Sequence, residues 1–225
     1  MVKWLIDPYA VAGVYLVFVT FIIDRGGEAP GLTVACAVVP FQLFVSTVLA
    51  SMRSVKDRRS LFLNLDFRRG LLPVALTMTE ALGFAASLSL LALMMAVYGV
   101  APTVAVLWLL PAIAVNLFFA LACSYPGTLF GVWYKDLIPF ALSALRILYF
   151  VAPGVIALSA ITGEANELVR LNPLTGIFEA YRDALLYGQA PAAWELLYPA
   201  GFAALVLAIS LPVFRSEERH FAKVA

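Results

Sequence analysis

Charged side chains that could do chemistry are concentrated in the C-terminal third of the chain. Glu164 and Glu167 are three positions apart, and Glu179 and Asp183 are four apart, so each pair would share one face of a helix. Two carboxyl groups held close together can act as a general acid and a general base. We favour a simpler interpretation, in which these are solvated or helix-end charges, because no other catalytic group accompanies them.

Sequence motifs for other kinds of catalysis are absent. His220 is the single histidine, so a histidine-based metal or catalytic cluster is excluded, and we expect no metal site. The sequence contains neither the G-x-x-x-x-G-K-[ST] phosphate loop nor the G-x-S-x-G nucleophile motif. We therefore expect a protein that is not itself an enzyme and binds no cofactor. If it moves something, the energy must come from a partner or from an ion gradient.

The helices that would position these charges are predicted to lie in a membrane. The 225 residues are 63% hydrophobic and only 13% charged, about half the roughly 25% charge of a soluble domain. A membrane-spanning helix needs about 20 mainly apolar residues. The sequence therefore predicts an all-α polytopic membrane protein, in which residues 1–225 form a single domain. Six segments qualify as transmembrane helices: 4–23, 32–52, 71–97, 103–133, 137–158 and 196–214.

The cations give the predicted orientation. One side of the predicted membrane holds 11 of the 15 Lys and Arg residues, in the loop 53–70, near residue 135 and at both termini. The positive-inside rule makes that side cytoplasmic, so both termini are cytoplasmic and residues 159–195 lie outside. We expect a multi-pass protein of the cytoplasmic membrane. A net charge of +1 gives no indication of nucleic-acid binding.

Two charged residues fall within predicted spans. Glu80 and Arg146 each lie about ten residues from the cytoplasmic end of a span, which places both at a depth of roughly 15 Å. Charges at such depth usually pair or face a polar cavity. We expect Glu80 and Arg146 to form an ion pair or to face a common polar route; a pair that only fixes helix packing is an equal alternative.

Residues 171–188 are too charged to span a membrane and too apolar for a linker. Asn172 and Pro173 are typical of a helix start, and Gly188 is a plausible stop. Apolar residues then recur at helical spacing from Leu174 to Leu185, so the charged side chains would face elsewhere. Because Pro153-Gly154 also interrupts the fifth span, we expect re-entrant or interfacial helices on the outer side.

The basic loop at residues 53–70 contains a short segment of mixed character. Lys56, Arg58 and Arg59 precede Leu61 and Phe62, which begin an apolar helical stripe. Such a helix can lie on the membrane or dock in a groove of a soluble partner. A basic loop lying at the lipid headgroups explains the pattern equally well.

An ordered set of motifs resembles one family. The segment Asn172-Pro173-Leu174-Thr175, with the Glu179-to-Asp183 motif EAYRD and then Gly188, resembles the last extracellular segment of type-2 ABC exporter permeases, in particular the polysaccharide exporters for O-antigen, teichoic acid and cell-wall glycans. Four further motifs occur in the family's order: Trp4-Leu5-Ile6-Asp7-Pro8, Phe67-Arg68 before Leu72-Pro73, Tyr134-Lys135-Asp136, and Val213-Phe214-Arg215. Phe67 replaces the family's usual proline, and members usually carry a longer segment before the first span.

This resemblance implies a permease that pairs with a second copy of itself and with two ATPase subunits, which bind ATP and Mg. The substrate would be a lipid-linked glycan. The basic loop would be a cytoplasmic coupling helix, and the segment 171–188 would form an outer gate. The implied residues are Tyr15, Phe18, Arg146, Tyr149 and Phe150 for the substrate path; Lys56, Arg58, Arg59, Leu61 and Phe62 for coupling to the ATPase; and Asn172, Pro173, Glu179, Tyr181, Arg182 and Asp183 for the gate.

Two alternatives remain. One keeps the superfamily and changes the substrate, giving a type-2 ABC exporter of a drug or a lipid. The other is a membrane enzyme or a structural membrane subunit.

Overall fold

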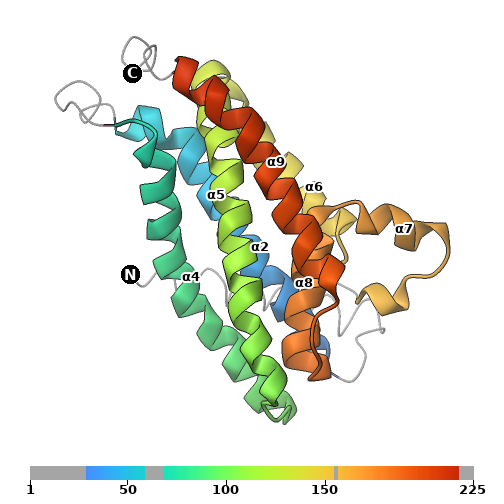
Figure 1. The fold of residues 1–225 in the computed structure, drawn as a ribbon. Helices are drawn as coiled ribbons and strands as arrows, with labels where there is room; N and C mark the ends of the chain where they lie inside the picture. The colour runs from blue at the N-terminus through green and yellow to red at the C-terminus, as the bar shows by residue number, and fades with distance from the viewer. Residues whose placement is uncertain (1–28, 59–67, 155–156, 218–225) are drawn as a thin grey trace.

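The described part of the chain, residues 29–58, 68–154 and 157–217 of a computed structural model, consists of helices and connecting turns without a strand (Figure 1). The longer helices are α2 (Pro30–Asp57), α4 (Leu71–Tyr98), α5 (Leu109–Trp133), α6 (Ile138–Val151) and α9 (Ala193–Glu217). The shorter elements are η2 (Val104–Trp108), η3 (Lys135–Leu137), η4 (Leu158–Ala160), α7 (Glu164–Arg170), α8 (Pro173–Arg182) and the π-helical turn η5 (Asp183–Tyr187).

Four helical segments in the described ranges are long and apolar enough to cross a membrane: α2, α4, η2 with α5, and α9. They coincide with four of the six predicted spans. Large apolar side chains on their outer faces are exposed, such as Leu82 on α4 (70%) and Ile209 on α9 (63%). A lipid environment explains this exposure, because a bilayer removes the cost of leaving such side chains outside the protein core.

The predicted fifth span, residues 137–158, is not one continuous helix, and it is interrupted at Pro153-Gly154 as the sequence indicated. Helix α6 has 14 residues, about 21 Å in length, whereas the hydrocarbon core of a bilayer is about 30 Å thick. The helix ends at Val151 because Pro153 disfavours helical geometry in the residue before it, and Ala152 is extended with ψ 151°. The first predicted span, residues 4–23, lies outside the described residues.

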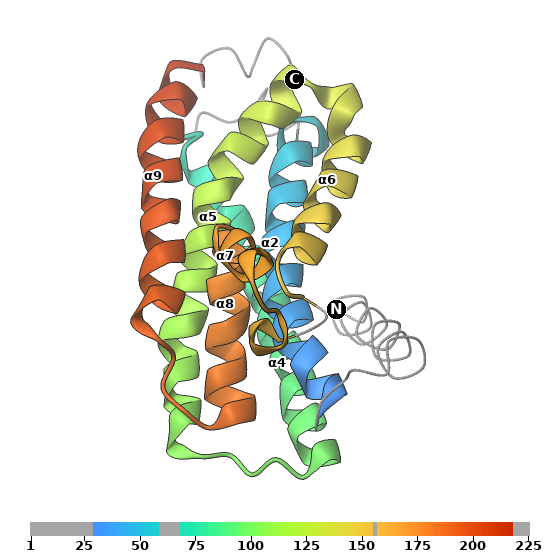
Figure 2. The same ribbon diagram turned by 90° about the vertical axis from the view of Figure 1, so that its right-hand side faces the viewer.

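Helix α2 occupies the centre of the bundle and packs against α4, α5, α6 and α8 (Figures 1 and 2). Its closest neighbour is α5, which has glycines one turn apart at Gly127 and Gly131. A Cβ added at Gly131 would lie 1.8 Å from the carbonyl oxygen of Met52, so only glycine permits this approach of the two backbones. Small residues spaced by four let membrane helices pack this closely.

The helix ends that carry most of the described basic residues lie together at one end of the bundle. The C-termini of α2, α5 and α9 and the N-terminus of α4 meet at the top of Figure 1. Lys56 near the end of α2 and Arg215 near the end of α9 are both exposed there. At the opposite end Gly99, with φ 66°, terminates α4 in the left-handed conformation that glycine favours.

Candidate functional site around the buried helix α8

Helix α8 begins at the Asn-Pro pair that the sequence predicted as a helix start. The Asn172 side chain accepts a hydrogen bond from the backbone N–H of Leu174 at 3.1 Å, and Pro173 occupies the first helical position, where its missing N–H costs nothing. The Asn172 amide also donates to the carbonyl of Leu148 on α6 at 3.0 Å. The cap therefore fixes the start of α8 against the end of α6.

The expected exposure of the charges on α8 is wrong, because every residue from Leu174 to Arg182 is buried. The helix lies inside the bundle, packed against α9, α2 and α5 (Figure 2). Periodicity identified the apolar side of α8 correctly, but the other side also faces protein. Glu179 and Arg182 are therefore interior charges rather than surface charges.

Glu179 and Arg182 neutralise one another and bind three backbone segments. The Arg182 guanidinium donates to Glu179 Oε1 at 2.6 Å, and Glu179 Oε1 also accepts from the backbone N–H of Leu158 at 3.1 Å. Arg182 donates further to the carbonyls of Thr33 on α2, at 3.2 Å, and of Gly154 after α6, at 3.3 Å. One guanidinium thus joins α8 to α2 and to the connection that follows α6, a task that suits its planar set of five donors.

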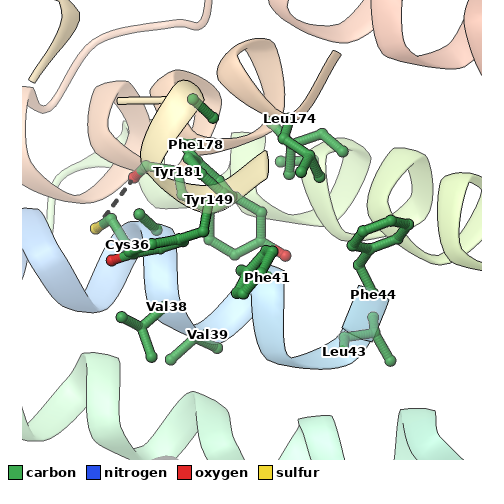
Figure 3. Packing of buried hydrophobic residues seen from close by; sticks show 14 of the residues in the cluster. Cys36, Val38, Val39, Phe41, Leu43, Phe44, Tyr149, Leu174, Phe178 and Tyr181 are labelled. Carbon is green, nitrogen blue, oxygen red and sulfur yellow. Dashed lines mark hydrogen bonds between the residues drawn. The ribbon is translucent and has the colours of Figure 1, made fainter. Parts of the chain in front are cut away.

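A cluster of aromatic side chains packs against this network on the side that faces α6. Tyr149 is completely buried, and its hydroxyl donates to the Gly154 carbonyl at 2.9 Å, the same oxygen that accepts from Arg182. Its ring packs on those of Phe41 at 4.8 Å and Phe178 at 5.9 Å between centroids (Figure 3). Tyr149 therefore serves the packing of α6 against α2 and α8, and does not line an open route in this structure.

A second group of charges, Asp183 at the start of η5 and Glu195 near the start of α9, lies beside the contact of α8 with α9. Asp183 and Glu195 are both more than nine-tenths buried, and their carboxyl groups are within hydrogen-bonding reach of each other. Gln189 donates to Asp183 Oδ1 at 2.9 Å, whereas Glu195 Oε2 has no hydrogen-bond donor among the described residues. Burial raises the pKa of Asp183, the Gln189 hydrogen bond lowers it, and the Glu179 charge raises it further.

Sequence analysis did not select Glu195 as a site residue. Its position at the start of a predicted span, among aromatic residues, is typical of an interface residue, and its contact with Asp183 comes only from the folding of α9 against α8. Helices α8 and α9 pack closely at this point, because a Cβ added at Gly176 of α8 would lie 2.8 Å from the Glu195 carbonyl oxygen. The available signal was a carboxylate directly before the first residue of an apolar predicted span, 196–214.

The two predicted intramembrane charges do not form an ion pair within one chain. Glu80 is half-buried on α4, and Arg146 is exposed on α6. No ion pair between these two described residues is present, because α4 packs on α2 and α5 while α6 packs on α2 and η3. Their exposure to a common polar route stays a prediction.

The remaining predicted residues are dispersed. Phe150 is exposed on α6, and Lys56 and Arg58, at the end of α2, are exposed and half-buried. Of the other proposed path and coupling residues, Tyr15, Phe18, Arg59, Leu61 and Phe62 lie outside the described part of the chain.

Spanning-length apolar helices around a short, charged, buried helix define a multi-pass membrane protein. No family model matches the sequence. The chain is, however, similar to proteins named O-antigen export system permease protein RfbA. It is 26% identical to the one from Myxococcus xanthus over 83% of this chain and 72% of that protein. It is 23% identical to two from Klebsiella pneumoniae, over 88% and 82% of this chain and 77% and 71% of theirs. These similarities confirm the resemblance to polysaccharide export permeases that the motifs indicated.

Proposed function

We propose that this protein is the permease subunit of an ABC exporter that moves a lipid-linked polysaccharide across the cytoplasmic membrane. The observation that carries the proposal is similarity over more than four-fifths of the chain to permeases named for O-antigen export. The apolar helices of spanning length agree with it. In this assignment the chain moves the polysaccharide, and a separate ATPase subunit, which binds ATP and Mg, hydrolyses the nucleotide.

The working assembly in this proposal contains two copies of the permease and two ATPase subunits. Each copy is a single domain of residues 1–225, and six membrane passes are made by adding residues 4–23 and the segment containing α6 to the four long helices. Both termini are cytoplasmic. The clustering of exposed basic residues at one end of the bundle supports this orientation, because cytoplasmic loops carry an excess of Lys and Arg.

The coupling surface in this proposal is the basic end of the bundle. Lys56 and Arg58, with Arg59, Leu61 and Phe62, would dock on the ATPase. Exposed cations at the end of the central helix α2 support this role, since a displacement there moves the element on which α4, α5, α6 and α8 pack.

The path and the gate in this proposal lie on α6 and α8. Arg146 and Phe150 are exposed on α6 and, with Tyr15 and Phe18, would face the glycan; Tyr149 would support them from the core. Asn172, Pro173, Glu179, Tyr181, Arg182 and Asp183 would belong to the outer gate. The support for this role is a short helix whose charged side chains, Glu179 and Arg182, bind backbone groups of α2 and of the segment after α6.

The test is genetic and biochemical. Deletion of the gene should remove the glycan from the cell surface and accumulate its lipid-linked form on the inner side, and the intact gene should restore export. The purified protein should carry an ATPase subunit with it. The charge-reversed variant Lys56→Glu/Arg58→Glu should lose that association, while Glu167→Gln, an exposed change on α7, should keep it.

The alternatives predict different results in the same strains. Normal surface glycan with altered drug tolerance or lipid composition would favour a drug or lipid exporter. Absence of an ATPase from the purified complex under all conditions would contradict the exporter assignment and favour a membrane enzyme or a structural subunit.

A further inference from the structure

Two acidic residues 12 positions apart in sequence, Asp183 at the start of η5 and Glu195 near the start of α9, lie close together where α8 packs on α9. Asp183 is 8% exposed and Glu195 is 6% exposed, so water reaches neither freely. The chain between them, residues 188–192, leaves η5 at Gly188 and returns to the start of α9 (Figure 1). Any attraction between the two carboxyl groups therefore holds this return loop closed.

Their hydrogen-bonding inventory requires a proton. Ionised carboxylates only accept hydrogen bonds, so two of them within reach of each other repel unless one carries hydrogen. Gln189 supplies a donor to Asp183, but Glu195 Oε2 is buried without one among the described residues. A proton placed between the two carboxyl groups removes the repulsion.

The surrounding charges do not offer another solution. Arg182, the cation adjacent to Asp183 in sequence, is bound to Glu179 at 2.6 Å and to the Thr33 and Gly154 carbonyls. Glu179 adds a further negative charge acting on both Asp183 and Glu195. Arg170 of α7 stacks on the ring of Trp194, the residue before Glu195, with its Cζ 5.1 Å from the ring centroid. Helix η2, which packs on η5, has no titratable side chain.

We propose that Asp183 and Glu195 share one proton, and that this proton-loaded pair is a pH-sensitive latch that fastens η5 and the return loop to α9. Loss of the proton places two carboxylates side by side in a buried site, and they separate. The loop then opens at the end of α8. This latch does not depend on the identity of the exported substrate.

The sign of the pH dependence follows from proton counting. The closed latch holds one proton, and the open form, in which both carboxyl groups are solvated, holds none near neutral pH. Stability of the closed form therefore falls as pH rises, in agreement with the raised pKa of Asp183. Between the pKa of a solvated carboxyl and that of the closed pair, the closed-to-open ratio falls roughly tenfold per pH unit.

Hydrogen exchange of the full-length protein in lipid nanodiscs tests the latch. After correction for the intrinsic pH dependence of exchange, protection of the segment 183–195 should fall as pH rises. In Glu195→Gln the amide donates to Asp183 permanently, so protection should be independent of pH. Glu167→Gln, which removes an exposed carboxyl group from α7, should retain the wild-type pH dependence.

Infrared spectroscopy of the wild type gives a readout that needs no substitution. A protonated carboxyl band should be present at neutral pH, should disappear on alkaline titration, and should be lost at neutral pH in Asp183→Asn and in Glu195→Gln. The latch is overturned if this band is absent from the wild type at neutral pH. It is equally overturned if Glu195→Gln keeps the pH dependence of protection.

Discussion

The replacement Arg182→Met isolates the contribution of the interior ion pair. Methionine retains most of the volume and the apolar stem of arginine, so the packing of α8 is disturbed little. The substitution removes the charged partner of Glu179 and the donors to the carbonyls of Thr33 and Gly154. Gly154 keeps the Tyr149 hydroxyl as a donor, and among the described residues Glu179 keeps the N–H of Leu158.

The expected cost is about 3–5 kcal/mol in the free energy of unfolding, the range for removing one partner of a buried ion pair. Most of it comes from the carboxylate left without a countercharge rather than from the attraction lost. The double variant Glu179→Met/Arg182→Met removes both charges, and it should therefore be more stable than Arg182→Met alone. Arg53→Met, at an exposed position on α2, should change stability by less than about 0.5 kcal/mol.

Reversible unfolding of the purified proteins by SDS in mixed micelles measures these differences. All four proteins should be compared at one pH. The reasoning is refuted if Arg182→Met costs less than about 1 kcal/mol, or if the double variant is no more stable than Arg182→Met alone.

Four further substitutions test the packing of the helices. Gly131→Ala should destabilise by about 1–3 kcal/mol or more, because the new methyl group would overlap the Met52 carbonyl, whereas Gly201→Ala has open space and should stabilise α9 by up to about 1 kcal/mol in the same unfolding assay. Asn172→Ala removes the α8 cap and should cost about 1 kcal/mol, with faster hydrogen exchange in the first turn of that helix. Tyr149→Phe keeps the ring contacts and loses one hydrogen bond, so thermal unfolding should show a loss of about 0.5–1.5 kcal/mol; a larger loss would mean that the hydroxyl also positions Arg182.

The start and stop of α8 show how much local sequence can predict. Asn172 and Pro173 begin the helix, and Gly188 ends η5 with φ 62°, as the residue types indicated. Such signals are reliable because capping and left-handed geometry depend on a few neighbouring atoms. The early end of α6 before Pro153 is local in the same sense, and the sequence indicated it through Pro153-Gly154.

The surroundings of α8 could not be predicted in this way. Periodicity divides a helix into an apolar side and a polar side, and the polar side is assigned to solvent by default. Here that side meets α2 and the segment after α6, which supply carbonyl acceptors from Thr33 and Gly154, residues about 150 and 30 positions away from Arg182. Every residue has a backbone carbonyl, so residue types do not indicate which carbonyls will bind the Arg182 guanidinium. These contacts could therefore not be predicted from the sequence.

The sequence by itself determined the membrane class, the four long helices, and the family resemblance, because hydropathy and capping are properties of neighbouring residues. The tertiary structure alone decided which charges are interior. It turned Glu179 and Arg182 from expected surface charges into a buried pair, and it brought Glu195 to Asp183. The physical reason is that the cost of burying a charge depends on which distant groups reach it, and only the packing of α2, α8 and α9 supplies them.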